Sequence, residues 1–144
     1  MRISSQADLA VRLRLVIART ARRLRQEAGS ELSPSQAAAL ATIDRHGPLT
    51  PSELADRERI KRPTATRVIA WLEEAGLVDR TPDPQDGRSS LVTLTPAGRV
   101  LLDRVRARKD VYLAQRLREL DPEERATLDR AAAILERVLE GEVA

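Results

Sequence analysis

Cysteine is absent from this 144-residue sequence, and histidine occurs only once, as His46. The absence of cysteine excludes disulfides, thiolate zinc sites and thiol-based redox sensing, and it fits a reducing compartment such as the cytoplasm. A single histidine is too few for a histidine-rich metal centre. We therefore expect a cytoplasmic protein that carries no metal and no other cofactor.

Aromatic side chains are almost as rare, because Trp71 and Tyr112 are the only two and phenylalanine is absent. Proteins that bind single-stranded nucleic acids stack the bases on aromatic platforms, so the composition argues against that class and against an RRM-type sheet. The core must be built from Leu, Val, Ile and Ala, which suits packed helices.

The sequence also lacks long apolar runs. Its purely apolar stretches span about one helical turn at most, so we expect neither a membrane-spanning helix nor a secretory signal. A Gly-rich phosphate loop is missing, and the lone His46 offers no convincing Ser-His-Asp set. We therefore expect no membrane partner and no enzymatic activity.

The net charge is +3, but the charges are unevenly distributed. Residues 1–28 hold seven Arg against two acidic side chains, whereas residues 117–144 hold four Arg against eight. Such asymmetry can indicate nucleic-acid binding. The alternative, which we favour, is that the two ends form helices that pair with one another.

Apolar residues recur at three- and four-residue steps from Leu9 to Ala28, which predicts a long amphipathic helix ending at Gly29. The segment 33–36 (SPSQ) has the form of a capping box with proline at the first helical position. It predicts a second helix that stops at residues 46–48 (HGP).

Two short helices joined by a tight connection are predicted next. The first opens with the capping pattern of residues 50–53 (TPSE), and the second begins near Arg62-Pro63 and stops at Gly76. This arrangement is typical of a helix-turn-helix.

The apolar spacing then changes to that of strands, over residues 77–81 and 89–94. These flank residues 82–88, a stretch dense in turn-forming residues, and predict a hairpin with a long charged tip. Two further helices begin after Thr95-Pro96 and Asp121-Pro122.

With these elements in order, the chain resembles the MarR family of winged helix-turn-helix transcriptional regulators. The resemblance covers about residues 9 to 140 and is carried by motifs at matching spacing. These are Leu54-Ala55, residues 63–69 (PTATRVI), residues 72–78 (LEEAGLV), Asp83-Pro84, Asp86-Gly87-Arg88, residues 92–95 (VTLT) and Gly98.

The resemblance implies a mainly α fold with a small β-hairpin wing, that is, a winged helix-turn-helix flanked by N- and C-terminal dimerisation helices. Residues 1–30 and 97–144 would form the helical dimerisation region, and residues 31–96 the DNA-binding lobe. It implies a homodimer that binds double-stranded DNA at a pseudo-palindromic operator, with half-sites roughly 34 Å apart. Repression is the family's commoner mode.

The expected DNA-binding residues lie at the start of the second helix of the motif and at the tip of the wing. They are Arg62, Pro63, Thr64, Thr66, Arg67, Asp86, Gly87 and Arg88. Arginine can donate a bidentate pair to guanine, and threonine offers a hydroxyl and a methyl group. Arg88 could enter a narrow minor groove, and Asp86 would brace Arg88 or Arg67. The alternatives are a structural ion pair for Arg67 and a plain exposed turn for the wing.

Members of the family often release DNA when a small anionic, frequently phenolic, effector binds between the dimer helices and the DNA-binding lobe. The candidates for such a pocket are Arg12, Arg19, His46, Trp71 and Tyr112. Each has a simpler explanation as an exposed cation, a helix end or a filler of the aliphatic core. The rival function is a dimeric helical module, ligand-binding or protein-binding, without DNA binding.

Overall fold

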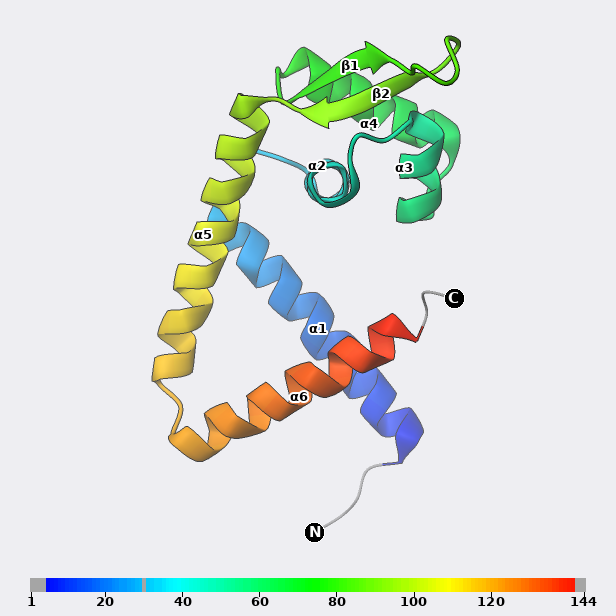
Figure 1. Cartoon of the computed structure of the whole chain (residues 1–144). Coiled ribbons are helices and arrows are strands. Elements are labelled where there is room, and N and C mark those ends of the chain that lie inside the picture. The colour runs from blue at the N-terminus through cyan, green and yellow to red at the C-terminus, as the bar shows by residue number, and fades with distance from the viewer. Residues whose placement is uncertain (1–4, 30, 142–144) are drawn as a thin grey trace.

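The computed structural model describes residues 5–29 and 31–141. Its elements, in chain order, are α1 (Gln6–Ala28), α2 (Pro34–His46), α3 (Pro51–Glu58), α4 (Arg62–Glu74), β1 (Val78–Pro82), β2 (Ser90–Leu94), α5 (Pro96–Arg118) and α6 (Pro122–Glu140) (Figure 1). The predicted order of four helices, a hairpin and two helices is confirmed.

Helix starts are set by local sequence. Five of the six helices begin after a side chain that accepts a hydrogen bond from a first-turn N–H group, which satisfies one of the free donors at the helix end. These capping residues are Ser5, Ser33, Thr50, Thr95 and Asp121. The exception is α4, whose N-cap, Lys61, makes no side-chain capping bond.

A compact lobe, residues 34–94, holds most of the buried core. Helices α2, α3 and α4 and the hairpin enclose it, and α5 adds Leu102. The fully enclosed large side chains are Leu40, Leu49, Leu54, Ile69, Leu72, Val78 and Val92. Each contributes about 1.5–3 kcal/mol by leaving water, so apolar packing sets the relative positions of these helices.

The hairpin pairs β1 with β2 in antiparallel register, from Val78 opposite Leu94 to Pro82 opposite Ser90. Leu49 and Val92 exchange two backbone hydrogen bonds, which attach the α2–α3 connection to β2. The first strand starts at Val78 and not at Leu77 as the sequence pattern predicts. Leu77 instead completes the end of α4, because its N–H donates to Leu72 beyond the left-handed Gly76.

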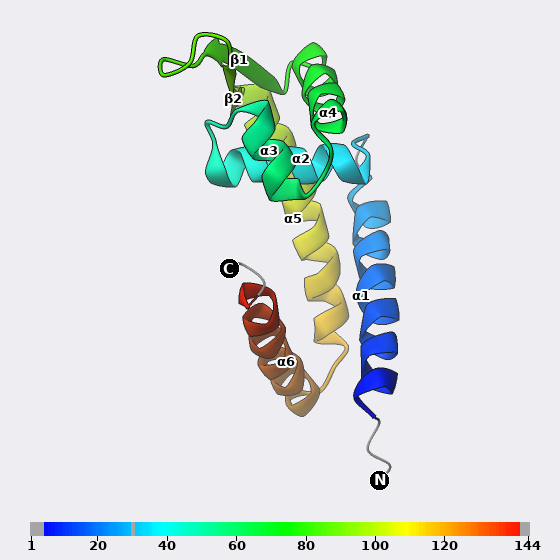
Figure 2. The same cartoon turned by 90° about the vertical axis from the view of Figure 1, so that its right-hand side faces the viewer.

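Three long helices extend away from the lobe. α1 lies beside α5, α5 runs from the lobe to α6, and α6 stands apart from α1 (Figure 2). α6 buries none of its residues. Its exposed large apolar side chains include Leu128, Ile134, Val138 and Leu139. The sequence pattern therefore leaves an apolar stripe that this chain does not cover. No helix in the described part of the chain is long and apolar enough to cross a membrane.

Candidate nucleic-acid interface

Helix α4 presents one apolar face to the lobe and one polar face to solvent. Ala65, Ile69 and Leu72 are buried at spacings of four and three residues, so they lie on one side of the helix. Arg62, Pro63, Thr66 and Arg67 are exposed, as the sequence predicts, whereas Thr64 is half-buried at the edge of the core. The polar face of α4 is therefore held in place by the packing of its apolar face.

The turn before α4 is set by Arg59, which adopts a left-handed conformation with φ 53°. The N–H of Ile60 donates to the carbonyl of Ala55, closing the end of α3 as in a Schellman motif. The sequence offers no glycine here to mark the turn.

Thr66 and Arg67 differ in how their polar groups are used. The Thr66 hydroxyl donates to the Arg62 carbonyl at 3.0 Å, so its proton is occupied within the helix. Arg67 makes no ion pair within residues 5–29 and 31–141, so the alternative role of a structural ion pair has no acidic partner there.

The wing tip, residues 83–89, is an ordered turn. Asp83 accepts from the Gln85 N–H at 2.9 Å, and Asp86 accepts from the Arg88 N–H at 3.1 Å. The Arg88 side chain is 98% exposed, and its Nε lies 4.0 Å from the Asp86 carboxylate. Asp86 therefore braces the Arg88 backbone more than its guanidinium. Gly87 faces open space.

An ion pair between Arg80 and Glu73 joins the wing to α4. The Arg80 Nε lies 3.4 Å from a carboxylate oxygen of Glu73. Because Glu73 is in α4 and Arg80 in β1, the pair links the wing to the helix that carries Arg67, although the Arg80 Nε makes no hydrogen bond among the residues described. Sequence reasoning missed both residues, since neither lies in a motif whose spacing marks a pair.

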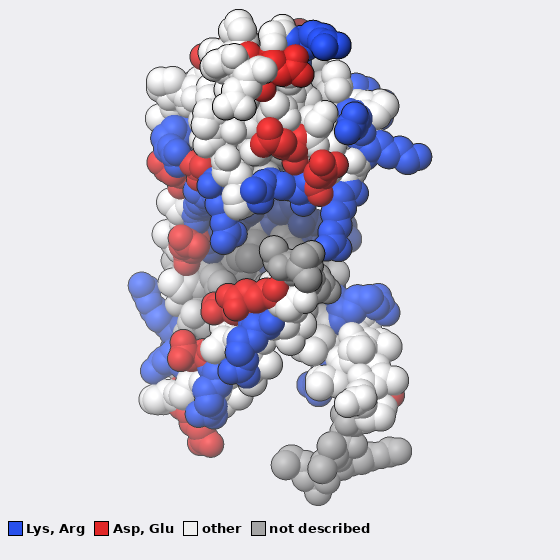
Figure 3. All heavy atoms as spheres, turned by 45° about the vertical axis from the view of Figure 1, so that its right-hand side comes forward, with Lys and Arg blue, Asp and Glu red and all other residues white. Residues whose placement is uncertain are grey.

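Figure 3 shows Lys and Arg side chains gathered around the hollow between the lobe and α6, whereas acidic and basic side chains are mixed near the top of the lobe. The lobe therefore has no uniformly basic surface on this face. Within the wing tip, residues 83–89, Arg88 is the one basic side chain available to a phosphate.

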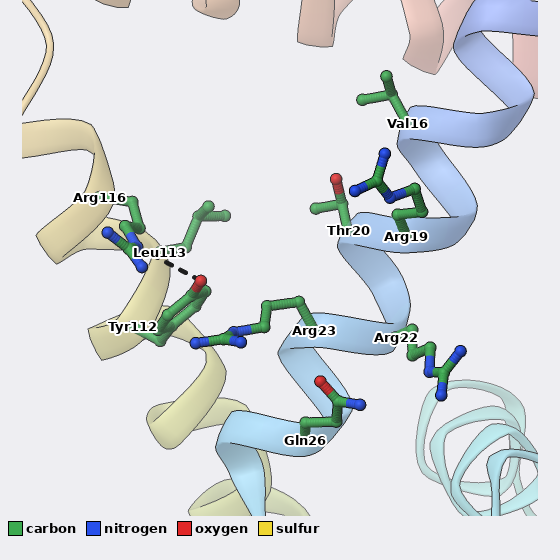
Figure 4. Close-up of a pocket in the computed structure, with 9 residues that line it drawn as sticks. All are labelled: Val16, Arg19, Thr20, Arg22, Arg23, Gln26, Tyr112, Leu113 and Arg116. Atoms are coloured by element: carbon green, nitrogen blue, oxygen red, sulfur yellow. Dashed lines mark hydrogen bonds between the residues drawn. The ribbon is translucent and has the colours of Figure 1, made fainter.

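The five candidate effector residues do not form one site. Arg19 and Tyr112 line a groove of about 720 Å³ between α1 and α5, together with Arg23 and Arg116 (Figure 4). The Tyr112 ring lies between two guanidinium groups, at 5.6 Å from Arg23 and 5.5 Å from Arg116. A hydrogen bond from Arg116 is the main cause that lowers the pKa of Tyr112 below its ordinary value.

Trp71 lies elsewhere, at the junction of α4 and α5. It lines a cavity of about 780 Å³ whose walls are mainly apolar and include Leu77, Val100 and Leu101. Arg104 and Arg108 supply positive charge to the same cavity, and Glu31 supplies one negative charge. Arg108 also donates to the carbonyl of Ala28 at 2.9 Å, whereas Arg104 makes no ion pair among the residues described.

The remaining two candidates lie outside both sites. Arg12 is exposed on α1, and His46 is exposed at the end of α2. Partial desolvation, followed by the nearby charges of Arg57 and Arg45, lowers the pKa of His46, so its imidazole is neutral near pH 7. A neutral imidazole contributes little to binding an anion.

The comparisons with known proteins agree with this geometry. Residues 32–90 match the model of the MarR family. An HTH-type transcriptional regulator of Mycobacterium tuberculosis is 42% identical over 134 residues, which cover 92% of this chain and 94% of the relative. A crystal structure of a transcriptional regulator from Pseudomonas aeruginosa is 36% identical, with a TM-score of 0.83, over 94% of this chain and 98% of that one.

The chain belongs to the MarR family. The HTH-type transcriptional repressor MdtR of Bacillus subtilis is also similar, at 32% identity over 93 residues covering 65% of this chain and 60% of MdtR. The MarR-family fold with a winged helix-turn-helix is thus confirmed, and the protein is a DNA-binding transcriptional regulator and not an enzyme.

Within this MarR-family fold, sequence reasoning missed one further cluster. Asp44, in the last turn of α2, contacts both Arg99 and Arg106 of α5. No motif marks these residues, because they are 55 and 62 positions apart in the sequence. Only the crossing of α2 over α5 brings them together.

Proposed function

We propose that the protein acts as a homodimer that binds a pseudo-palindromic DNA operator and represses transcription. The observation that carries this proposal is the exposed face of α4, where Arg62, Thr66 and Arg67 are oriented by the buried side of the same helix. The similarity to the repressor MdtR supports repression.

In this proposal α4 enters the major groove, as the second helix of a helix-turn-helix does. Arg67 donates to a guanine edge or to phosphate. Thr66, whose proton is occupied by the Arg62 carbonyl, presents its methyl group and oxygen lone pairs to the bases. Arg62, Pro63 and Thr64 lie at the helix start, next to the backbone of the DNA.

The wing contributes Arg88, which would reach into an adjacent minor groove, where the potential is more negative. Asp86 and Gly87 shape the turn that carries it. Asp86 holds the Arg88 backbone through its 3.1 Å hydrogen bond.

The dimer would be formed by residues 1–30 and 97–144, with residues 31–96 as the DNA-binding lobe. Residues 1–4, 30 and 142–144 of these ranges lie outside the described residues. Support comes from the uncovered apolar stripe of α6 and from charge. The helix is acidic, and the groove between α1 and α5 is lined by Arg19, Arg22, Arg23 and Arg116. The acidic α6 of a second copy is complementary in charge to such a groove.

The experiment that tests the proposal is fluorescence anisotropy with a labelled duplex from the promoter of the protein's own gene. Wild type should bind more tightly than to a random duplex. The logarithm of its affinity should fall linearly with the logarithm of salt concentration, with a slope that reports several neutralised phosphates. If no duplex, including those selected from a random library, binds better than random sequence, the rival module without DNA binding is correct.

We also propose that a small aromatic carboxylate or phenolate releases the DNA by entering the cavity beside Trp71. The cavity combines apolar walls with Arg104, whose charge is unpaired among the described residues. Because Trp71 belongs to α4, a ligand there contacts the helix that reads DNA.

Trp71 is the only tryptophan in the chain, so its fluorescence reports this cavity directly. Titration with benzoate and its hydroxylated derivatives should change Trp71 emission and release labelled DNA over the same concentration range. Arg104→Ala should weaken both effects. Release of DNA without any change in Trp71 emission would instead assign the effector to the groove beside Tyr112.

A further inference from the structure

The Asp44 carboxylate is shared by two guanidinium groups of one helix. One oxygen pairs with Arg99, and the other accepts from Arg106 at 3.0 Å. The Asp44 side chain is only 13% exposed, whereas the side chains of Arg99 and Arg106 remain about half exposed. The two arginines hold the pKa of Asp44 below its ordinary value of 3.8, against the effect of its burial.

Arg99 and Arg106 are seven residues apart, which places them about two turns apart on one face of α5. A single carboxylate held from two levels of a helix resists sliding along the helix or pivoting on it, because either movement strains a charge-assisted bond. The packing of apolar side chains between α2 and α5 sets the crossing of the two helices. The two ion pairs add a directional constraint at the C-terminal end of α2.

The crossing angle between α2 and α5 affects the position of the lobe, because α5 extends out of the lobe. α5 leads from the lobe to α6, and α2 crosses it inside the lobe (Figure 1). A change in the α2–α5 angle turns the whole lobe, including α4 and the wing, relative to the long helices.

We propose that Asp44 is a positioning residue for DNA recognition. By fixing the lobe on α5, it sets the separation of the two α4 helices in the dimer and hence the half-site spacing that the protein accepts. This inference rests on the proposed function as a dimeric DNA reader. It assigns a role to a residue that lies outside α4, the wing and the cavity beside Trp71.

The first test compares wild type with Asp44→Asn, which keeps the size of the side chain and removes its charge. The probe is a duplex selected from a random library by wild type, together with versions in which one base pair is added or removed between the half-sites. Wild type should lose on the order of tenfold in affinity per altered spacing, the scale of one mismatched base pair. Asp44→Asn should lose only about twofold or less.

Asp56→Asn is the matched control, because it makes the same change on an exposed position of α3, away from Arg99 and Arg106, and Asp56 forms no ion pair among the residues described. It should retain the spacing selectivity of wild type. If Asp44→Asn fails to fold, Arg99→Gln combined with Arg106→Gln removes the same contacts from half-exposed positions. Asp44→Glu should restore part of the selectivity.

The second test measures geometry without DNA. Because the chain has no cysteine, Gln85→Cys places one nitroxide label per protomer on the wing tip. The distribution of distances between the two labels should be narrow in the Gln85→Cys protein that retains Asp44. It should be broader or shifted when Asp44→Asn is added.

The inference is overturned if Asp44→Asn loses stability but keeps both the spacing selectivity and the narrow distribution, because the role is then only structural. If wild type itself selects no duplex, the proposed function has failed. The distance measurement then still decides whether Asp44 fixes the lobe.

Discussion

The Asp86 carboxylate accepts a hydrogen bond from the Arg88 N–H at 3.1 Å, while the Arg88 side chain beyond it is 98% exposed. A wing arginine held at its backbone and free at its guanidinium is suited to binding DNA. Arg88→Ala should weaken operator binding about 5- to 150-fold, the range of one good specific contact. Anisotropy measures the loss.

Two variants of Asp86 distinguish the effect of its hydrogen bond to the Arg88 N–H from the effect of its negative charge. Asp86→Asn keeps an acceptor oxygen and should bind nearly as wild type, whereas Asp86→Ala loosens the turn and should weaken binding. Equal affinities of wild type and Arg88→Ala would remove the wing from the interface.

The apolar stripe of α6 predicts the oligomeric state. Leu135 is half-buried and lies seven residues, about two turns, after Leu128, so it is on the same side of α6. Leu135→Asp places a charge within the stripe and should convert the dimer to a monomer, because an unpaired buried carboxylate costs more than an apolar contact contributes. DNA affinity should fall with it, since each monomer reads only one half-site. Sedimentation velocity gives the mass.

Ala133→Asp introduces the same group on the opposite, exposed side of α6 and should remain dimeric. A monomeric Leu135→Asp variant that binds the operator as tightly as wild type would contradict the dimer model.

Asp44 predicts how stability depends on pH. Its pKa is lowered in the folded state, mainly by Arg99, so its ion pairs stabilise the protein above its ordinary value of 3.8. That contribution is lost as pH falls through the folded-state pKa. The difference in free energy of unfolding between wild type and Asp44→Asn should therefore be largest near neutral pH and shrink in acid. Urea unfolding from neutral pH to about pH 3 measures it. A difference that stays constant over this range would show that Asp44 is not held ionised by its partners.

Arg59 predicts a stabilising substitution in the turn between α3 and α4. A non-glycine residue with φ 53° pays a steric cost that glycine avoids. Arg59→Gly should therefore raise the free energy of unfolding by up to about 1 kcal/mol. Arg57→Gly, in the last turn of α3, should lower it by up to about 1 kcal/mol because glycine has a low helix propensity. Chemical denaturation distinguishes the two, and a loss of stability in both would exclude strain at Arg59.

At Gly98, by contrast, we expect a substitution to destabilise the protein. A Cβ at this position would collide with the Leu77 carbonyl, where α5 lies against the end of α4. Gly98→Ala should lower the free energy of unfolding by about 1–3 kcal/mol, since the backbone must shift to admit it. Gly87→Ala meets open space at the wing tip and should leave stability unchanged. If both variants unfold like wild type, the contact between α5 and Leu77 is looser than described.

The sequence by itself determined the elements and most of their ends, because caps, prolines and turn residues act locally. Ser33 with Gln36 and Thr50 with Glu53 start their helices where the pattern predicts, and Gly29 and Gly76 end theirs. The buried face of α4 likewise follows from spacing alone, since residues three and four apart share one side of a helix. That placed Thr66 and Arg67 on the opposite, exposed side.

Only the tertiary structure decided which distant residues meet. The separation of Tyr112 from Trp71 into two sites and the Asp44 cluster depend on helix crossings, and the Arg80–Glu73 link depends on the packing of β1 against α4. Crossing angles are set by the packing of many side chains at once, and no local spacing encodes them. The residue types of the effector candidates can be read from the sequence. The distances between these residues depend on how the chain folds.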